Sequence, residues 1–299
     1  MPELELTPLG LGTVALAAPY GAPGAERAAP DRRQAAEAIE VALDAGVRVI
    51  DTAPAYGEAE TIVGDVAGAA GCVIATKLAI PPAGWHALRE IETRDAVRAS
   101  AHASLAALRR DTIDLLQVHN ADEHLVQRGW VLEELEALRA EGLVRMTGAT
   151  VYGEANALAA LDGFDAVQVA YNALDRRPEE RVLPAARERG RRVFTRSSLL
   201  RGVLSAAGRD LNGPFRALRE AANRFREAAG ATWEELPGAA TAWAAQRPGV
   251  DCTLLGPRDA CELRELLDGA ERFRERTAGL DFRADELPPD LLDPSRWPG

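Results

Sequence analysis

The chain has 299 residues, a net charge of −11 and an apolar content of 47%, which suffices for one large barrel or for two average domains. The acidic charge argues against nucleic acid or a membrane as a main partner, and the sequence contains neither a bilayer-length apolar run nor a signal peptide pattern. The three cysteines lack metal-ligand spacing, so we expect reduced thiols and a cytoplasmic protein without a bound metal.

Strand-like and helix-like segments alternate along the whole chain. Strands are expected where short β-branched runs occur, at 9–14, 47–51, 72–77, 113–119, 144–150, 166–171, 192–196 and 251–255. Helical patterns fall between them, at 31–45, 59–68, 93–108, 131–141, 155–161, 179–189, 216–247 and 260–277. Asp31 and Gly46 suit the amino-terminal cap and the carboxyl-terminal stop of the first helix.

These segments form eight strand–helix units with no linker-like break between them. Alternation implies parallel strands joined by right-handed crossovers, and eight units in about 300 residues favour a closed barrel. We therefore predict an α/β fold, a (β/α)8 TIM barrel that forms a single domain over residues 1–299. The proline-rich tail from about residue 279 is expected either to fold over the barrel mouth or to form a partly ordered end.

Titratable side chains stand at the predicted carboxyl ends of three neighbouring strands. Asp51, Lys77 and His119 end the second, third and fourth strands, and Tyr56 lies on the loop after the second. Chemistry in barrels of this kind takes place at these ends. Lys77 is also the only lysine among 35 basic residues, and arginine cannot replace an amine that must tune its pKa or form an imine. The structural alternative is a solvated carboxylate, a packing tyrosine and a lysine retained by chance.

The four residues suit proton transfer to a carbonyl oxygen. A phenol, with a pKa of about 10, is a weak acid near neutral pH unless a nearby ammonium lowers that pKa. Lys77 is placed to do so for Tyr56, and Asp51 to orient Lys77. His119 is suited to fix the carbonyl through a hydrogen bond. No side chain supplies a hydride, so the set implies a nicotinamide cofactor.

The motifs and their order resemble the aldo-keto reductase superfamily. The resemblance is carried by GLGT (10–13), DTAPAYG (51–57), Lys77, VH (118–119), GATVYG (148–153), FDAVQVAYNALDRR (164–177) and SSLLRGVL (197–204). It implies a bacterial member of that superfamily, a barrel that binds NAD or NADP without a Rossmann fold and reversibly reduces an aldehyde or ketone, sugar-like compounds included. By family roles, Tyr56 is the general acid/base, Asp51 and Lys77 tune it, and His119 orients the carbonyl.

The resemblance also implies a set of cofactor contacts. For the nicotinamide, its ribose and the pyrophosphate, the implied residues are Asp51, Thr150, Gln168, Arg196, Ser197 and Leu199. For the adenine end, they are Gly256, Arg258 and Glu265. Arg196 stands where many members have an aromatic ring, and Glu262 stands where arginine or glutamine is usual. With Asp259 and Glu262 beside it, Arg258 is the one nearby cation for a 2′-phosphate. We therefore expect only modest discrimination between NAD and NADP.

Loops at the same end of the barrel suggest a pocket for a small-molecule carbonyl or alcohol, lined by Tyr20, Trp85, Asn120, His124 and Tyr152. His86 and His102 are expected on the surface, and the protein is expected to be a monomer or a weak homo-oligomer. Two other functions stay open at this point. A lyase or aldolase would use Lys77 to form a Schiff base, and a non-catalytic subunit would only sense the cofactor.

Overall fold

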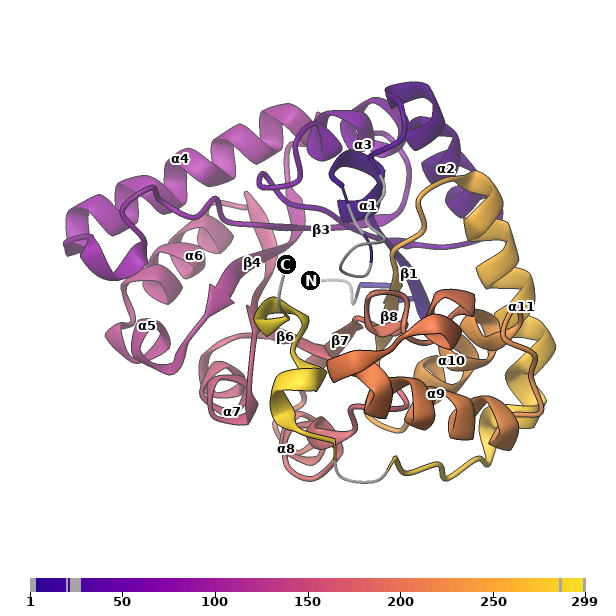
Figure 1. The fold of residues 1–299 in the computed structure, drawn as a ribbon. Coiled ribbons are helices and arrows are strands. Elements are labelled where there is room, and N and C mark those ends of the chain that lie inside the picture. Colours follow the sequence, from indigo (N-terminus) through magenta and orange to yellow (C-terminus); the bar gives the residue numbers. More distant parts are fainter. Residues whose placement is uncertain (1–3, 20, 22–27, 285–286, 298–299) are drawn as a thin grey trace.

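The computed structural model describes residues 4–19, 21, 28–284 and 287–297, and eight strands form its centre (Figure 1). The strands are β1 (Leu9–Gly12), β2 (Val49–Asp51), β3 (Val73–Lys77), β4 (Ile113–Ala121), β5 (Val144–Val151), β6 (Ala166–Ala170), β7 (Arg192–Arg196) and β8 (Cys252–Leu255). They pair in parallel and in chain order, and β8 pairs with β1 to close the barrel. The predicted (β/α)8 barrel is confirmed.

Helices form the outer layer around the strands (Figure 1). They are α1 (Val14–Ala17), α2 (Arg32–Asp44), α3 (Ala59–Ala67), α4 (Glu90–Leu108), α5 (Glu123–Arg128), α6 (Trp130–Ala140), α7 (Glu154–Gly163), α8 (Val182–Glu188), α9 (Arg216–Ala228), α10 (Leu236–Ala245) and α11 (Ala260–Ala278). Helical spacing of apolar residues gives the longer helices a buried face. In α2 the buried residues are Ala35, Ala38, Ile39 and Ala42.

The start of α4 differs from the sequence prediction. The helix begins at Glu90 rather than at Thr93. The Glu92 side chain accepts a hydrogen bond from the Arg89 backbone N–H at 2.9 Å and so satisfies a group at the helix start. Thr93 lies inside the first turn instead of capping it, and its hydroxyl donates to the Arg89 carbonyl at 2.9 Å. A cap formed by a carboxylate reaching backwards therefore extends this helix by one turn.

The end of β4 is a second difference. The strand was predicted to stop at His119 but continues to Ala121 with a register shift against β5. Asn120 takes up this irregularity with a φ of 55°, a conformation that asparagine tolerates better than most residues. Asp122 then caps the unpredicted helix α5 by accepting a hydrogen bond from a backbone N–H at 2.8 Å. The short helix α1 was likewise not predicted.

Alternation along the strands sorts side chains between the inside and the outside of the barrel. Because successive side chains point to opposite faces, a residue two positions further on faces the same side. The interior is filled by Val49, Val73, Ala75, Leu115, Ala166, Phe194, Cys252 and Leu254. On β2 and β3 the inward series therefore end at Asp51 and Lys77. On β4 it continues past Leu115 to Gln117 and His119. Core packing thus sets the direction of the polar side chains at the barrel mouth.

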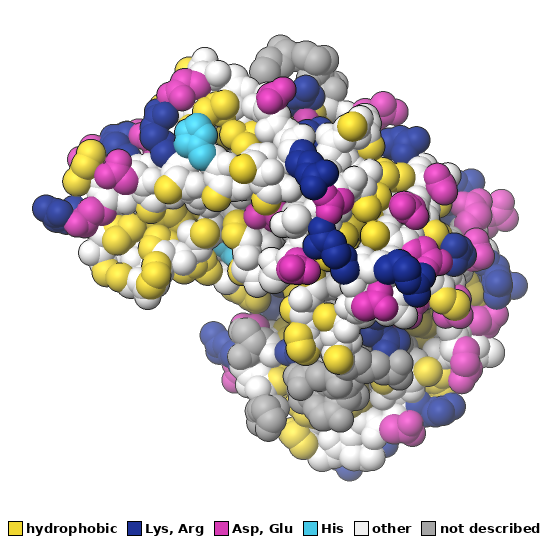
Figure 2. All heavy atoms as spheres, turned by 90° about the horizontal axis from the view of Figure 1, so that it is seen from above, with side chains coloured by type: hydrophobic (Ala, Val, Ile, Leu, Met, Phe, Trp, Pro, Cys, Tyr) yellow, Lys and Arg dark blue, Asp and Glu magenta, His cyan; other side chains and the backbone are white. Residues whose placement is uncertain are grey.

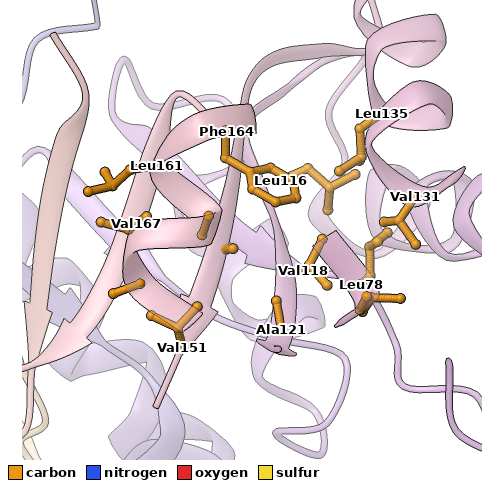
Figure 3. Close-up of a cluster of buried hydrophobic side chains, with 14 of the residues drawn as sticks. Leu78, Leu116, Val118, Ala121, Val131, Leu135, Val151, Leu161, Phe164 and Val167 are labelled. Carbon is orange, nitrogen blue, oxygen red and sulfur yellow. The ribbon is translucent and has the colours of Figure 1, made fainter. Parts of the chain in front are cut away.

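Outward-facing side chains of the strands pack against the helices. Figure 3 shows one such cluster, in which Leu116 and Val118 of β4 lie close to Phe164 and to Leu135 of α6. Full burial of side chains this large contributes about 1.5–3 kcal/mol each. The strand ends are therefore held by apolar contacts on both faces of the barrel wall.

The carboxyl-terminal tail packs against the side of the barrel that carries α9 and α10. Phe282 and Leu292 join the apolar cluster there, and Trp243 donates from Nε1 to the Leu280 carbonyl at 2.9 Å. Further on, Pro294 lines the cavity described below. Figure 1 shows this last, yellow segment crossing near the barrel centre. That the tail covers the barrel mouth stays a prediction. The position of Pro294 in the cavity lining supports it.

The charged surface is mixed rather than divided by sign. On the face in Figure 2, which lies above the view of Figure 1, Lys and Arg side chains alternate with Asp and Glu side chains. Among the described residues visible on this face, the basic side chains form no continuous stripe.

Candidate active site

Asp51 and Lys77 form a buried ion pair at the barrel mouth. Each ends its strand and faces inward, as the alternation on β2 and β3 requires. Lys77 Nζ lies 2.7 Å from Asp51 Oδ2, and the two side chains are 1% and 6% exposed. A buried pair of this kind is stable only when further hydrogen bonds satisfy both partners. Both partners have such bonds.

Amide side chains complete the contacts of the Asp51 carboxylate. Its Oδ1 accepts hydrogen bonds from Gln168 Nε2 at 2.8 Å and from Gln117 Nε2 at 3.2 Å. Lys77 Nζ also donates to the Thr52 carbonyl at 2.8 Å. Burial alone lowers the pKa of Lys77, but Asp51 and Tyr56 more than reverse this effect, so that the pKa is raised. The side chain is therefore a fixed ammonium at neutral pH.

Tyr56 lies on the loop after β2, against this ammonium. Lys77 Nζ is 4.8 Å from the centre of the tyrosine ring. The rings of Tyr56 and His119 are 6.1 Å apart and meet edge to face at 87°. Burial raises the pKa of Tyr56, and the opposing effect of Lys77 offsets this only in part. Lys77 lowers this pKa, as the sequence led us to expect, but burial is the larger effect. The hydroxyl is accordingly protonated at neutral pH, the form that a general acid needs.

His119 is a neutral imidazole in this setting. Burial, followed by the positive charges of Lys77 and Arg196, lowers the pKa of His119 to about 4. Its Nδ1 is buried and has no hydrogen-bond partner within the part of the chain that the structure describes. A neutral imidazole carries one N–H donor, so His119 can hydrogen-bond an oxygen beside Tyr56 without adding a charge.

Arg196 brings a further cation to the reacting end. It ends β7, where its guanidinium carbon lies 4.2 Å from the centre of the Tyr152 ring. Its Nη2 donates to the Val151 carbonyl at 3.2 Å. The guanidinium charge lowers the pKa of both Tyr56 and His119, although burial is the larger influence on each. Its electric field therefore reaches both Tyr56 and His119.

These residues lie in one cavity of 830 Å³ at the carboxyl ends of the strands. Cavities of about 300–1,000 Å³ are typical of ligand sites. The charged side chains of the described lining are four cations and two anions, namely Lys77, Arg196, Arg201, Arg258, Asp51 and Glu262. The lining is thus net positive in a chain whose net charge is −11, which favours an anionic ligand.

The loop after β7 borders this cavity and is strained. Ser197, Leu200 and Arg201 have positive φ values of 62°, 44° and 51°, which cost free energy and often mark ligand-binding segments. Buried Asn172 holds the loop by donating from Nδ2 to the Ser197 carbonyl at 3.0 Å. Arg201 lines the cavity, and its Nε donates to the Gly21 carbonyl at 2.8 Å. The volume, the positive lining and this loop fit a dinucleotide.

The start of α11 forms the outer border of the cavity. Arg258 and Glu262 both line it and are paired, with Arg258 Nε 3.0 Å from Glu262 Oε2. The backbone N–H of Arg258 donates to the same oxygen at 2.8 Å. Asp259 caps the helix by accepting from the Glu262 N–H at 2.8 Å. The arginine predicted to meet a 2′-phosphate is thus bound to the acid one helical turn away.

Most of the predicted site residues line this one cavity. They are Asp51, Tyr56, Lys77, His119, Asn120, Thr150, Tyr152, Gln168, Arg196, Ser197, Leu199, Gly256 and Arg258. Gln168 points to Asp51, and the Thr150 hydroxyl accepts from the Asn120 N–H at 2.8 Å. Polar side chains at the strand ends therefore form hydrogen bonds from one strand to another, in addition to lining the cavity.

Other predicted residues lie elsewhere. Trp85, in a short helix (Trp85–Ala87), is 5% exposed and belongs to an apolar cluster with Val97 of α4 and Leu125 of α5, not to the cavity lining. Glu265 is exposed on α11, with one oxygen 3.8 Å from Cys261 Sγ. The ring of His124 lies 5.4 Å from that of His86, outside the cavity. Tyr20 lies outside the described residues.

Three contributors were missed in the sequence. Gln117 precedes His119 by two positions on β4, and period-2 alternation could have identified it as inward-facing. Arg201 lies in the segment SSLLRGVL (197–204). From the sequence we assigned Ser197 and Leu199 of this segment to the cofactor but did not name Arg201. Glu262 was noted only as a departure from the family pattern. Its pairing with Arg258 follows from spacing i, i+4 at a helix start, which we had not considered.

Metal and membrane features were also searched for over the described ranges. Within them, no group of three or more His, Cys, Asp or Glu residues is arranged to hold a metal ion. No helix in that part of the chain is long and apolar enough to cross a bilayer.

A barrel with a buried lysine–carboxylate pair beside a protonated tyrosine, and with room for a dinucleotide, defines an oxidoreductase of carbonyl or alcohol groups. The sequence profile described as the Aldo/keto reductase family matches residues 8–274. The chain therefore belongs to the aldo/keto reductase family and is an NAD(P)-dependent oxidoreductase. Members of this family reduce carbonyl groups of small molecules with NADH or NADPH.

Individual relatives agree with this assignment. The aldo-keto reductase YhdN of Bacillus subtilis is 29% identical over 288 residues, covering 88% of this chain and 85% of that protein. The pyridoxal 4-dehydrogenase of Microbacterium luteolum is 31% identical over 247 residues, covering 68% of this chain and 70% of that protein. The structure of a glycerol dehydrogenase from Gluconobacter oxydans superimposes with a TM-score of 0.72 at 22% identity, covering 96% of each chain. This last likeness bears on the fold alone.

Proposed function

We propose that the enzyme reduces a small aldehyde or ketone to an alcohol, or catalyses the reverse, with Tyr56 as the general acid/base. The observation that carries this proposal is the position of Tyr56. Its ring lies 4.8 Å from the ammonium of Lys77 and 6.1 Å from the ring of His119. A carbonyl oxygen that approaches between the tyrosine and the histidine meets two donors at once.

Each residue has a distinct part in this mechanism. The bound dinucleotide supplies the hydride. As negative charge develops on the carbonyl oxygen, the Tyr56 hydroxyl transfers its proton to that oxygen. Lys77, held as an ammonium by Asp51, stabilises the phenolate that remains. His119 hydrogen-bonds the oxygen and fixes its position. In alcohol oxidation the Tyr56 phenolate accepts the proton instead.

A lyase or aldolase mechanism receives less support from the same geometry. A Schiff base requires an unprotonated amine that can attack a carbonyl. Lys77 instead donates to Asp51 and to the Thr52 carbonyl at 2.7 and 2.8 Å, and its raised pKa keeps it protonated. Attack by this nitrogen would require loss of a proton, and the imine that follows keeps at most one N–H, so at least one of these hydrogen bonds would be lost.

The proposed substrates are small polar carbonyl compounds. Asn120 and Tyr152 line the cavity on the side of His119 and Arg196, so a ligand there meets an amide, a phenol and a guanidinium. One relative is named a pyridoxal 4-dehydrogenase, after a hydroxylated aromatic aldehyde of this size. A sugar-like or a hydroxylated aromatic aldehyde therefore suits the proposed site.

A turnover panel tests the proposal. Purified protein is supplied with NADH or NADPH and with glyceraldehyde, dihydroxyacetone, pyridoxal or benzaldehyde, and cofactor oxidation is followed by absorbance. We expect saturable turnover of at least one carbonyl, and no borohydride-dependent mass increase on Lys77 when substrate is present. Covalent trapping on Lys77 would instead establish a Schiff-base enzyme. Tight dinucleotide binding with no turnover of any compound would favour a non-catalytic subunit.

A further inference from the structure

We propose that Glu262 makes the cavity selective for a dinucleotide whose adenosine ribose carries a free 2′-hydroxyl, so that this enzyme uses NADH in preference to NADPH. The inference deepens the proposed function and rests on it. The sequence alone led us to expect modest discrimination, with Arg258 available to a 2′-phosphate. The structure places a carboxylate on that arginine, which reverses the expectation.

The adenosine end of the ligand is located by the order of the strands around the barrel. Tyr56 and His119 come from β2 and β4 and fix the reacting end, whereas the strained loop with Arg201 follows β7. Arg258 and Glu262 follow β8, which pairs with β7, and they line the cavity at the start of α11 in the outer layer of the barrel (Figure 1). A dinucleotide is elongated. With its nicotinamide beside Tyr56 and its pyrophosphate beside Arg201, its adenosine ribose therefore lies at the α11 end.

The charges at this outer end oppose a phosphate. Over residues 258–262 the structure describes one cationic side chain, Arg258, and two anionic ones, Asp259 and Glu262, while a 2′-phosphate brings up to two further negative charges. Arg258 donates to Glu262 Oε2 through both its Nε and its backbone N–H, at 3.0 and 2.8 Å. A phosphate would have to displace Glu262 from Arg258 and then lie beside the displaced carboxylate.

The same carboxylate suits a ribose hydroxyl. Both hydrogen bonds from Arg258 use Oε2 of Glu262, which leaves Oε1 to accept one from a hydroxyl group. A hydroxyl donates to a carboxylate, whereas a phosphate only accepts. Acidic side chains in dinucleotide-binding sheets distinguish the two cofactors by this chemistry, since an acid bonds the 2′-hydroxyl and an arginine accommodates the 2′-phosphate. The Asp259 cap holds Glu262 in the first turn of α11, so the acceptor is already oriented.

Equilibrium binding of the two reduced dinucleotides tests this inference without reference to turnover. The dissociation constants for NADH and NADPH are measured by isothermal titration calorimetry on the full chain. For the unmodified protein we expect NADH to bind at least tenfold more tightly. In Glu262→Gln the charge is lost and the preference should shrink about tenfold, chiefly through tighter NADPH binding. Glu275→Gln is the matched control, because it removes the same charge from an exposed position of α11, and its preference should equal that of the unmodified protein.

A second pair of variants tests the part played by Arg258. In the unmodified background Arg258→Met should change NADPH affinity little, since Glu262 already occupies the guanidinium. In the Glu262→Gln background the same change should abolish the gain in NADPH affinity. Equal affinities for NADH and NADPH, a preference for NADPH, or a preference unaltered by Glu262→Gln would overturn this inference and leave the proposed function intact. Binding of neither dinucleotide would overturn both.

Discussion

The two ends of the cavity each contain an ion pair, but the pairs differ in construction. At the reacting end, Lys77 and Asp51 are 2.7 Å apart with side chains 1% and 6% exposed. At the outer end, Arg258 and Glu262 are 3.0 Å apart with side chains 32% and 30% exposed. The inner pair joins two strands of the closed barrel, whereas the outer pair joins two positions four residues apart at a helix start.

With the roles proposed above, this difference separates chemistry from cofactor choice. The inner pair cannot rearrange without repacking the barrel, and loss of one partner leaves a buried charge unpaired. The outer pair can exchange partners at small cost, because water and salt already screen it. Cofactor preference can therefore change at α11 without disturbing proton transfer at β2 and β3. The predictions below test that separation, beginning with the largest effect.

Removing the acid at the reacting end should have the largest effect. We expect Tyr56→Phe to lower kcat by about 10²–10⁴-fold, the range of a positioned general acid. Dinucleotide affinity should stay within about twofold, because the hydroxyl acts only when charge develops on the substrate oxygen. Steady-state kinetics and calorimetry measure the two quantities. Retention of most of the activity would remove Tyr56 from the mechanism.

Breaking the inner pair should damage stability as well as activity. Lys77→Met leaves the Asp51 carboxylate buried without its cation, which we expect to cost about 3–5 kcal/mol in the free energy of unfolding. Urea denaturation measures this loss. The control is the double variant Lys77→Met with Asp51→Asn, which removes both charges and should recover much of the stability but none of the activity. A single variant as stable as the unmodified protein would show that the pair is not buried in solution.

The neutral state of His119 predicts a pH dependence of stability. Its pKa is lowered to about 4 in the folded chain, chiefly by burial, against an unfolded value of about 6.5. As pH falls, the unfolded chain therefore binds a proton at this histidine before the folded chain does. The free energy of unfolding decreases between about pH 6.5 and about pH 4 as a result. The loss amounts to roughly 3 kcal/mol at most. In His119→Gln the melting temperature should decline less over this pH range, because the titrating imidazole is gone. A decline as steep as that of the unmodified protein would show that His119 is not its cause.

The sequence predicted the reacting end better than the outer end, and the reason is physical. Asp51, Lys77 and His119 each follow a β-branched or apolar strand, and barrel closure brings such strand ends together. Helix and loop details depend on side-chain contacts that no short pattern determines. The pairing of Arg258 with Glu262 and the burial of Trp85 are two examples, since each depends on neighbours that only the folded chain supplies.

Arg196 should bias the reacting end toward the reduced cofactor. Its guanidinium acts on the same site as Tyr56 and His119, and oxidation of nicotinamide places a positive charge on the ring. We expect Arg196→Met to tighten NAD⁺ relative to NADH by about five- to tenfold, which corresponds to about 1 kcal/mol. Calorimetric titration with both forms measures this ratio. No change in the ratio would mean that Tyr152 and solvent neutralise the charge.

The outer pair should contribute least to stability, although we propose that it determines cofactor choice. Partly exposed pairs of this type contribute about 0–1 kcal/mol, so Glu262→Gln should lower the free energy of unfolding by no more than about 1 kcal/mol. Urea denaturation of Glu262→Gln beside Lys77→Met compares the two pairs under identical conditions. The expected outcome is a small loss at α11 against a large one at β2 and β3, with cofactor preference altered only by the former. A loss at Glu262 as large as that at Lys77 would mean that the α11 end is part of the structural core, and cofactor choice could not then vary independently of the barrel.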